Sequence, residues 1–577
     1  LLLNAVTKSG TNDLHGGAFF AYRDSKFGAN EPVIRNSDLE VQQFGFSLGG
    51  PIVKNKLHFF IAPEFQRRSQ PASGPFIGQT TNEAGIVSAD SVAAVRQALA
   101  SRFDVGAGER VTNDNPLTNL FGRLDFQVSE NHRLVFRQLI NSAESDAFSR
   151  NATPFNNAVG VQSSGFRLAS NAFTTENKNN SSVLQLYSYF SGGKSNEFIL
   201  GYNTVRDERI VPVRAPEISI GVTPPGGTSA NASITVGTEQ FSPGNLLEQK
   251  ILELQNNFTF PWQAHTFTFG ARYEHTDIFN NFAQQSFGAY KFANIAALRA
   301  GTPLNYAFAY SNGGPIAAEF AVGQYSVYAQ DQWNLTPKLA LTYGVRVDVP
   351  QFLDTPVRND TIFARFSAAG ITDVRTDVKP KTQLLWSPRI GLNFDPTGDR
   401  KNQIRAVAGI FTGPPPLIMI GNAYANTGLG LVRLLCSGTG NVPTFTTDVD
   451  QLPRACAGQA APLRGQAGTA GINITDPDFK YPQNFTGSLG FDRQLPWGTI
   501  FTFEGLYRKA INGVLVVDRN IRDPLRRSGG GPITDRTGRV LYWADSLSTT
   551  PGARRVVTTI GRPPVTFSEG VIQVTNQ

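Results

Sequence analysis

The sequence predicts an all-β protein, an antiparallel transmembrane β-barrel of the outer-membrane type. Three observations support this fold class. Stretches of about ten residues alternate between apolar and polar side chains, which is the period of a strand. These stretches come in pairs joined by short turns, and long segments rich in Gly, Pro, Asn, Ser and Thr separate the pairs. Outer-membrane barrels have this layout, with short periplasmic turns and long extracellular loops.

The clearest strand pair lies between residues 320 and 348. Every second side chain of residues 339–348 is apolar, so this strand has one apolar face and one polar or small face. Residues 323–333 alternate less strictly. Asp331 interrupts their apolar row, and we expect it at the end of its strand that is exposed to water. A turn containing Pro337 joins two strands that are long enough to cross a bilayer at a tilt.

The same pairing recurs along the chain after a first strand within residues 11–23. The predicted pairs are 41–50 with 57–61, 120–128 with 134–136, 184–186 with 198–202, 252–258 with 267–273, 323–333 with 339–348, 390–394 with 404–411, and 485–491 with 501–507. The long segments between them are approximately 64–118, 141–181, 206–249, 276–321, 349–386 and 413–483. This gives about fifteen strands, with irregular loops that would catch ligands outside the cell.

Composition agrees with this class and argues against others. The 577 residues include 42 Phe and 56 Gly, and only 17% are charged, which suits β-structure with long loops. The net charge is +7, but Lys and Arg are scattered singly, so we predict no nucleic-acid partner. A soluble sandwich or propeller is the alternative fold, although its strands would average about five or six residues.

The start of the chain resembles the middle of a gene. It opens on three leucines inside an apparent strand, without Met, a charged n-region or a cleavage site. We therefore interpret the sequence as a fragment. Its first and last strands would then have unpaired edges in an open sheet.

The two cysteines, Cys436 and Cys456, lie in one long loop segment. In an exported protein, two close cysteines predict a disulfide, and two free thiols are the alternative.

Several charged residues fall two positions apart and therefore on the same polar strand face. These candidate lumen-facing residues are Arg123, Asp125, Arg272, Glu274, Arg346 and Asp348. We expect them to pair with each other or with a plug in the lumen, and contact with a passing substrate is the alternative.

Three of the five tryptophans are associated with predicted short turns. Trp262 and Trp497 lie in such turns and Trp333 lies just before one. This placement predicts an interfacial belt of aromatic rings, and simple packing of the turns is the alternative.

The sequence carries no pattern typical of catalysis or metal binding. The five histidines are dispersed, and residues 221–227 lack the strand and helix that a phosphate-binding glycine loop requires. No nucleophile elbow with a following helix occurs either. We predict that the chain is not an enzyme and needs no cofactor or metal.

Several short motifs resemble those of TonB-dependent outer-membrane receptors, in particular the Oar-like subgroup. They are Asn4–Asn12 with His15–Gly16, which is similar to the junction between plug and barrel, and the hairpin motifs Gln43–Ile52, Tyr325–Trp333, Leu341–Arg346, Ser387–Gly391 and Gln494–Trp497. Each motif is short and structural, but together they span nearly the whole chain.

The resemblance implies a division of the chain and a function. Residues 1–10 would end a plug domain, and residues 11–577 would form part of a 22-stranded barrel whose C-terminal strands are missing. Family members usually carry a carboxypeptidase-regulatory-like domain ahead of the plug. The implied function is import of an extracellular ligand across the outer membrane, driven by the TonB–ExbB–ExbD complex. A passive porin or secretion channel is the alternative, and the substrate class stays open.

Overall fold

The computed structural model describes residues 7–28, 38–78, 87–150, 165–228, 232–313, 316–368, 370–462, 471–520, 557–558, 565–566 and 571–576. The chain divides into two compact units. The first comprises residues 1–310, 324–333 and 433–461, and the second comprises residues 311–323, 334–432 and 462–577.

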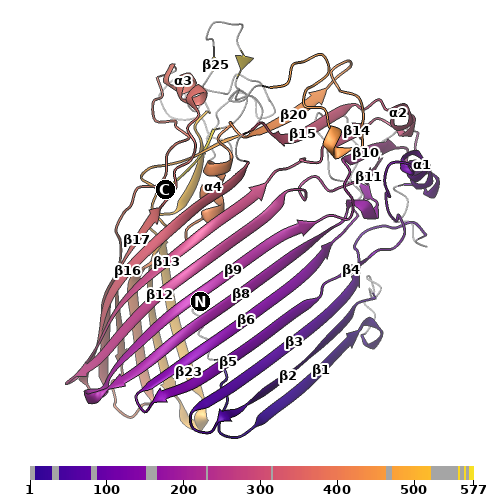
Figure 1. The fold of residues 1–577 in the computed structure, drawn as a ribbon. Helices are drawn as coiled ribbons and strands as arrows, with labels where there is room; N and C mark the ends of the chain where they lie inside the picture. The colour runs from indigo at the N-terminus through magenta and orange to yellow at the C-terminus, as the bar shows by residue number, and fades with distance from the viewer. Residues whose placement is uncertain are drawn as a thin grey trace. The chain divides into compact units, whose positions relative to one another are not determined.

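Long antiparallel strands dominate the first unit and are hydrogen-bonded in chain order (Figure 1). They are β1 (His15–Asp24), β2 (Glu40–Val53), β3 (Leu57–Pro71), β5 (Leu117–Ser129), β6 (His132–Ala147), β8 (Phe173–Phe190), β9 (Lys194–Ile210), β12 (Asn245–Trp262) and β13 (His265–Phe282). The short β4 (Thr112–Asp114) pairs with the end of β3. Within the described residues β1 pairs with β2 alone, and the open edge expected from sequence stays a prediction.

The second unit repeats this arrangement with β17 (Leu339–Phe352), β18 (Leu385–Phe394), β19 (Asn402–Thr412), β22 (Gln483–Gln494) and β23 (Ile500–Ala510). In the part of the chain described here, β23 pairs only with β22. The residues of β16 (Ala317–Thr336) are divided between the two units. The long strands of the two units, with β4 and β16, number 16, close to the predicted number.

The short turns lie where the sequence predicts them, but the strands reach further into them. Pro261 and Trp262 were expected in a turn and belong instead to β12, so only residues 263–264 connect β12 to β13. Gln263 has a φ of 53°, the left-handed conformation that closes so short a connection. A proline is tolerated here because Pro261 lies at the strand end.

The strands are also longer than a membrane crossing requires. Strands β8, β12 and β13 each contain 18 residues, whereas about 9 to 11 residues suffice to span a bilayer at a tilt. These strands therefore extend beyond the hydrocarbon layer on at least one side.

Alternation gives the large sheet of the first unit two different faces. We call the face that carries Arg123, Arg137 and Arg272 the polar face. The opposite face carries large apolar side chains that stay exposed, such as Phe136 (39%) and Phe269 (47%). A soluble protein rarely exposes so continuous an apolar surface, so this face is suited to contact with lipid.

A tyrosine on the polar face explains why position 270 is a glycine. Gly270 lies beneath the ring of Tyr328 from β16, and a Cβ atom at this position would collide with the far end of that ring. The Tyr328 hydroxyl donates a hydrogen bond to Asn257 Oδ1 and accepts one from Gln255 Nε2 at 3.2 Å. The ring therefore cannot move aside without losing these bonds.

We expect Gly270→Val to destabilise the barrel by about 1 to 3 kcal/mol, because the added side chain displaces the Tyr328 ring. Urea unfolding in lipid vesicles measures this change. The same substitution in a Tyr328→Ala background should cost much less, since the colliding ring is gone. An equal cost in both backgrounds would refute the steric explanation.

The long connections are not irregular throughout, which corrects the expectation from sequence. In the first unit they contain α1 (Ala89–Leu99), β7 (Phe166–Arg167), η3 (Ala169–Asn171), β10 (Glu217–Val222), β11 (Ala232–Val236), β14 (Ala289–Phe292), α2 (Ile295–Ala300) and most residues of β15 (Asn305–Ser311) and β20 (Leu431–Ser437). Most side chains of β10, β11, β14 and β15 are buried, so the apolar core of this unit lies in its loops.

The second unit also has structured connections. They contain α3 (Asp360–Ala368), α4 (Leu417–Ala425), β21 (Ile472–Thr475), β24 (Val514–Asp518), β25 (Val557–Thr558), β26 (Val565–Thr566) and β27 (Val571–Asn576). Residues of α3, β21 and β27 share a small core that includes Ile362, Phe366, Ile472 and Val571. Among the described helices of both units, none is long and apolar enough to cross a membrane.

Candidate functional site: the loop sheet and the polar face

The long loops of the first unit build a six-stranded sheet of their own, which we call the loop sheet. Its strand order is β20-β15-β14-β10-β11-β7. Strand β10 pairs antiparallel with β11 and parallel with β14, and β11 pairs parallel with β7. Parallel pairs join segments from different loops, so each loop satisfies backbone hydrogen bonds of another. An alternating stretch as short as Ile218-Ser-Ile220 is too brief to predict a strand from sequence.

A buried polar cluster links the loop sheet to η3. Glu217 Oε2 accepts hydrogen bonds from Asn171 Nδ2 and from the backbone N–H of Gln240, both at 3.2 Å. Asn171 Nδ2 also donates to the Gly237 carbonyl oxygen at 2.9 Å, and Asn171 Oδ1 accepts from Arg167 Nε at 2.6 Å. Glu217 and Asn171 are both fully buried. Asn171 therefore joins a buried carboxylate to the guanidinium of the half-buried Arg167.

The electrostatics of this cluster are unusual for a surface loop. Complete burial raises the pKa of the Glu217 carboxyl from 4.5 to about 7. The hydrogen bond from Asn171 lowers this pKa, the nearby Glu239 carboxylate raises it, and Arg167 lowers it. Glu217 Oε1 has no hydrogen-bond partner among the described residues. Glu217 is therefore close to half-ionised at neutral pH. The sequence does not predict this cluster, because Asn171 comes from another loop.

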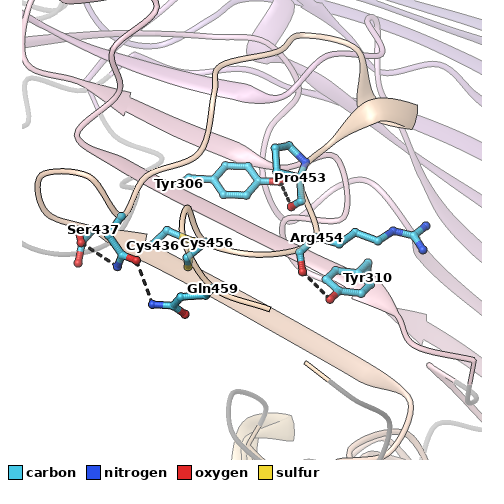
Figure 2. The surroundings of a disulfide bond; sticks show 9 residues. Tyr306, Tyr310, Cys436, Ser437, Pro453, Arg454, Cys456 and Gln459 are labelled. Carbon is cyan, nitrogen blue, oxygen red and sulfur yellow. Dashed lines mark hydrogen bonds between the residues drawn. A yellow bond between two sulfur atoms is a disulfide. The ribbon is translucent and has the colours of Figure 1, made fainter. Parts of the chain in front are cut away.

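Cys436 and Cys456 form a disulfide with an S–S distance of 1.95 Å, closing a segment with a sequence separation of 20 (Figure 2). Cys436 belongs to β20, at the edge of the loop sheet. Both sulfur-bearing residues are buried. The disulfide holds the segment that follows β20 at this edge.

The segment closed by the disulfide covers one end of the loop sheet. Tyr306 donates its hydroxyl to the Pro453 carbonyl oxygen and Tyr310 donates to that of Arg454, both at 2.9 Å (Figure 2). The Phe445 ring meets the rings of two β14 residues edge-on at 5.0 Å. Burial raises the pKa of Tyr306, as expected for a hydroxyl held among these rings. The loop sheet is thus well packed, and a disulfide cross-links the segment that covers its end.

We expect the double substitution C436S/C456S to destabilise the loop sheet by about 3 kcal/mol. A disulfide that closes a loop of this length lowers the conformational entropy of the unfolded chain, and this effect corresponds to about 3 kcal/mol of stability. Hydrogen exchange of β14 and β15 measures the change. Strands β12 and β13 serve as an internal control and should keep their protection. Equal loss of protection in all four strands would contradict a local role.

On the polar face, Arg123 and Asp125 form a largely buried, bidentate ion pair. Arg123 Nε and Nη2 donate to the two Asp125 carboxylate oxygens, both at 2.7 Å. Arg123 Nη1 donates to the carbonyl and hydroxyl oxygens of Thr7, both at 2.8 Å. The N-terminal segment beginning at Thr7 therefore lies against the polar face. That this face lines a lumen stays a prediction.

The other predicted charged residues also pair on their own strands. Arg272 donates to Glu274 and, at 2.6 Å, to Glu253 on β12, which sequence analysis missed because it lies on the neighbouring strand. The register places Glu253 directly opposite Glu274. In the second unit, Arg346 Nε donates to Asp348 Oδ1 at 2.9 Å.

The three candidate belt tryptophans differ in exposure. Trp262 ends β12 and is 56% exposed, and Trp497 lies in the turn after β22 and is 95% exposed. Trp333 is half-buried within β16, against the His265 ring at 5.1 Å. The expectation that Asp331 lies at a wet strand end is wrong, because it is buried and its Oδ2 bonds to His265 Nδ1 at 2.7 Å. The interfacial belt stays a prediction.

Comparison with known proteins identifies relatives of the same architecture. The family model described as "Outer membrane beta barrel domain" matches residues 6–116 and 105–553. The TonB-dependent transporter Oar from Myxococcus xanthus is 26% identical over 146 residues, which is 23% of this chain and 13% of that protein. It is a transporter rather than an enzyme, in agreement with the prediction for this chain.

Solved structures share the fold at low sequence identity. The outer membrane transporter YddB from Escherichia coli has a TM-score of 0.54 and 12% identity, covering 98% of this chain and 55% of that chain. The siderophore receptor PirA from Acinetobacter baumannii has a TM-score of 0.51 and 12% identity, covering 99% and 59% respectively. This chain thus spans little more than half the length of these solved relatives.

These matches confirm the resemblance to TonB-dependent receptors of the Oar-like subgroup. They also confirm the antiparallel barrel fold and a location in the bacterial outer membrane. Because the family model covers most of the sequence, the chain belongs to the outer membrane β-barrel domain family.

Proposed function

We propose that this chain is barrel and loop structure of a TonB-dependent receptor that binds an extracellular ligand and imports it into the periplasm. The loop sheet supplies a stable, disulfide-fastened surface where a ligand would first be held. The TonB–ExbB–ExbD complex would supply the energy. Residues 1–10 would be the end of the plug domain and residues 11–577 part of the barrel.

The observation that carries this proposal is the hydrogen bonding between Arg123 and Thr7. It sets the N-terminal segment against the polar face, which is where a plug would leave a barrel lumen. The identity to the transporter Oar supports the same assignment. The solved relatives include a protein described as a siderophore receptor, so a ferric siderophore is one substrate class to test, beside oligosaccharides and peptides.

The test is uptake by cells that lack the gene, compared with cells in which it is restored. We expect uptake of one substrate class to require the gene and to stop when a protonophore collapses the proton gradient. A passive porin or secretion channel would instead let the solute pass in the presence of the protonophore. Uptake that is unchanged by loss of the gene for every substrate class would overturn both functions.

A further inference from the structure

Two arginines on the polar face of β6 have no carboxylate partner within the part of the chain that the structure describes. The Arg123 guanidinium is engaged by Asp125 and Thr7, as described above. Arg133 and Arg137 form no ion pair among the described residues, and the Nε atom of each is buried without a hydrogen-bond acceptor there. A buried donor without an acceptor costs free energy, which a bound acceptor would recover.

Neutral groups hold both arginines in place. Arg137 Nη2 donates to Gln185 Oε1 at 3.2 Å, and the Arg133 guanidinium lies 4.9 Å from the centre of the Tyr187 ring. Arg137 is directly opposite Arg123 in the β5–β6 register. Like charges in this arrangement destabilise a strand pair, so a nearby negative charge would be favourable.

The acidic residues next to these arginines are already engaged. Asp125 binds Arg123 with both of its oxygens. Glu197 accepts a hydrogen bond from Gln185 Nε2, and its other oxygen accepts one from Asn257 Nδ2 at 3.0 Å. Three guanidinium groups therefore face two carboxylates, and this cluster carries a net positive charge. The buried side chain of Val135 lies between Asp125 and Gln185 in the register and adds an apolar surface to this cluster.

We propose that Arg133 and Arg137 bind an oxyanion, a carboxylate or a phosphate, on the polar face of β6 and β8. Guanidinium groups recognise such groups through charge-assisted hydrogen bonds. The oxyanion has two possible sources, a carboxylate side chain of polypeptide lying against the polar face or a free anion from solution. This site goes beyond the proposed function, because binding at equilibrium requires neither TonB nor a proton gradient.

The test measures the urea midpoint of the purified protein in lipid vesicles, with and without inorganic phosphate or citrate at constant ionic strength. We compare wild type, R133Q/R137Q and the control R67Q. Arg67 is an exposed arginine on β3 that donates to the carbonyl oxygen of Gln66. Single substitutions R133Q and R137Q retain one cation each and replace the double variant if it does not fold.

A free anion as the source predicts saturable stabilisation of wild type and R67Q, with at least tenfold weaker apparent affinity in R133Q/R137Q. A polypeptide carboxylate as the source predicts that the double variant is less stable than R67Q without added anion, while phosphate and citrate have no effect on wild type. The proposal is overturned if the double variant matches or exceeds R67Q in stability and wild type does not respond to either anion. None of these outcomes depends on uptake, so the proposed function is tested separately.

Discussion

Replacing Arg123 by methionine is expected to destabilise the barrel by roughly 3 to 5 kcal/mol, because the substitution leaves the Asp125 carboxylate buried without its cation. Both side chains of this pair are about 10% exposed, so water cannot take the place of the lost partner. Urea unfolding in lipid vesicles measures the loss. Trypsin should also cleave faster after Lys8, since Arg123 no longer holds the carbonyl and hydroxyl of Thr7.

A matched control is available in the second unit, where Arg405 pairs with Asp492 at 2.9 Å but is 46% exposed. Arg405→Met should cost no more than about 1 kcal/mol, because an exposed ion pair contributes little. The double substitution R123M/D125L should recover much of the loss seen with R123M. A cost for R123M no greater than that for Arg405→Met would contradict the assignment of Arg123 as a buried anchor.

Glu217→Gln is expected to remove a pH dependence of the loop sheet. In the folded protein burial raises the pKa of Glu217 to about 7, above its ordinary value of 4.5, so the folded state binds this proton more tightly than the unfolded chain. The resulting stability is fully present below about pH 4.5 and is lost as the pH rises through about 7. The shift corresponds to a loss of about 3 kcal/mol across this range.

Hydrogen exchange of β10 and β11, corrected for the intrinsic effect of pH, follows this change. Wild type should lose protection between pH 4.5 and 7, and E217Q should keep it and be the more protected protein at pH 7.5. Glu130→Gln, which removes an exposed carboxylate from the turn after β5, should behave like wild type. Persistence of the full pH dependence in E217Q would show that another group is responsible.

Much of the barrel was predictable because a strand has a local period of two. Alternation over residues 339–348 predicts β17 and its faces, and the spacing of Arg123 and Asp125 places them on the same face. The short turns are recognisable for the same reason, since each interrupts an alternating pattern. Only their limits were wrong, as at Pro261, where the strand continues to its last paired residue.

The loop sheet and the contacts between distant segments were not predictable from the sequence. The parallel pairing of β10 with β14 and of β7 with β11 joins loops far apart in the sequence. The burial of Glu217 depends on Asn171 from another loop, and the contact of Arg123 with Thr7 spans 116 positions. Glu253 reaches Arg272 only through the register of two strands. Alternation thus predicted the faces of long strands such as β17, because the face of a strand residue follows from its neighbours along the chain. Which distant segments meet depends on the whole packed chain, and no local pattern encodes it.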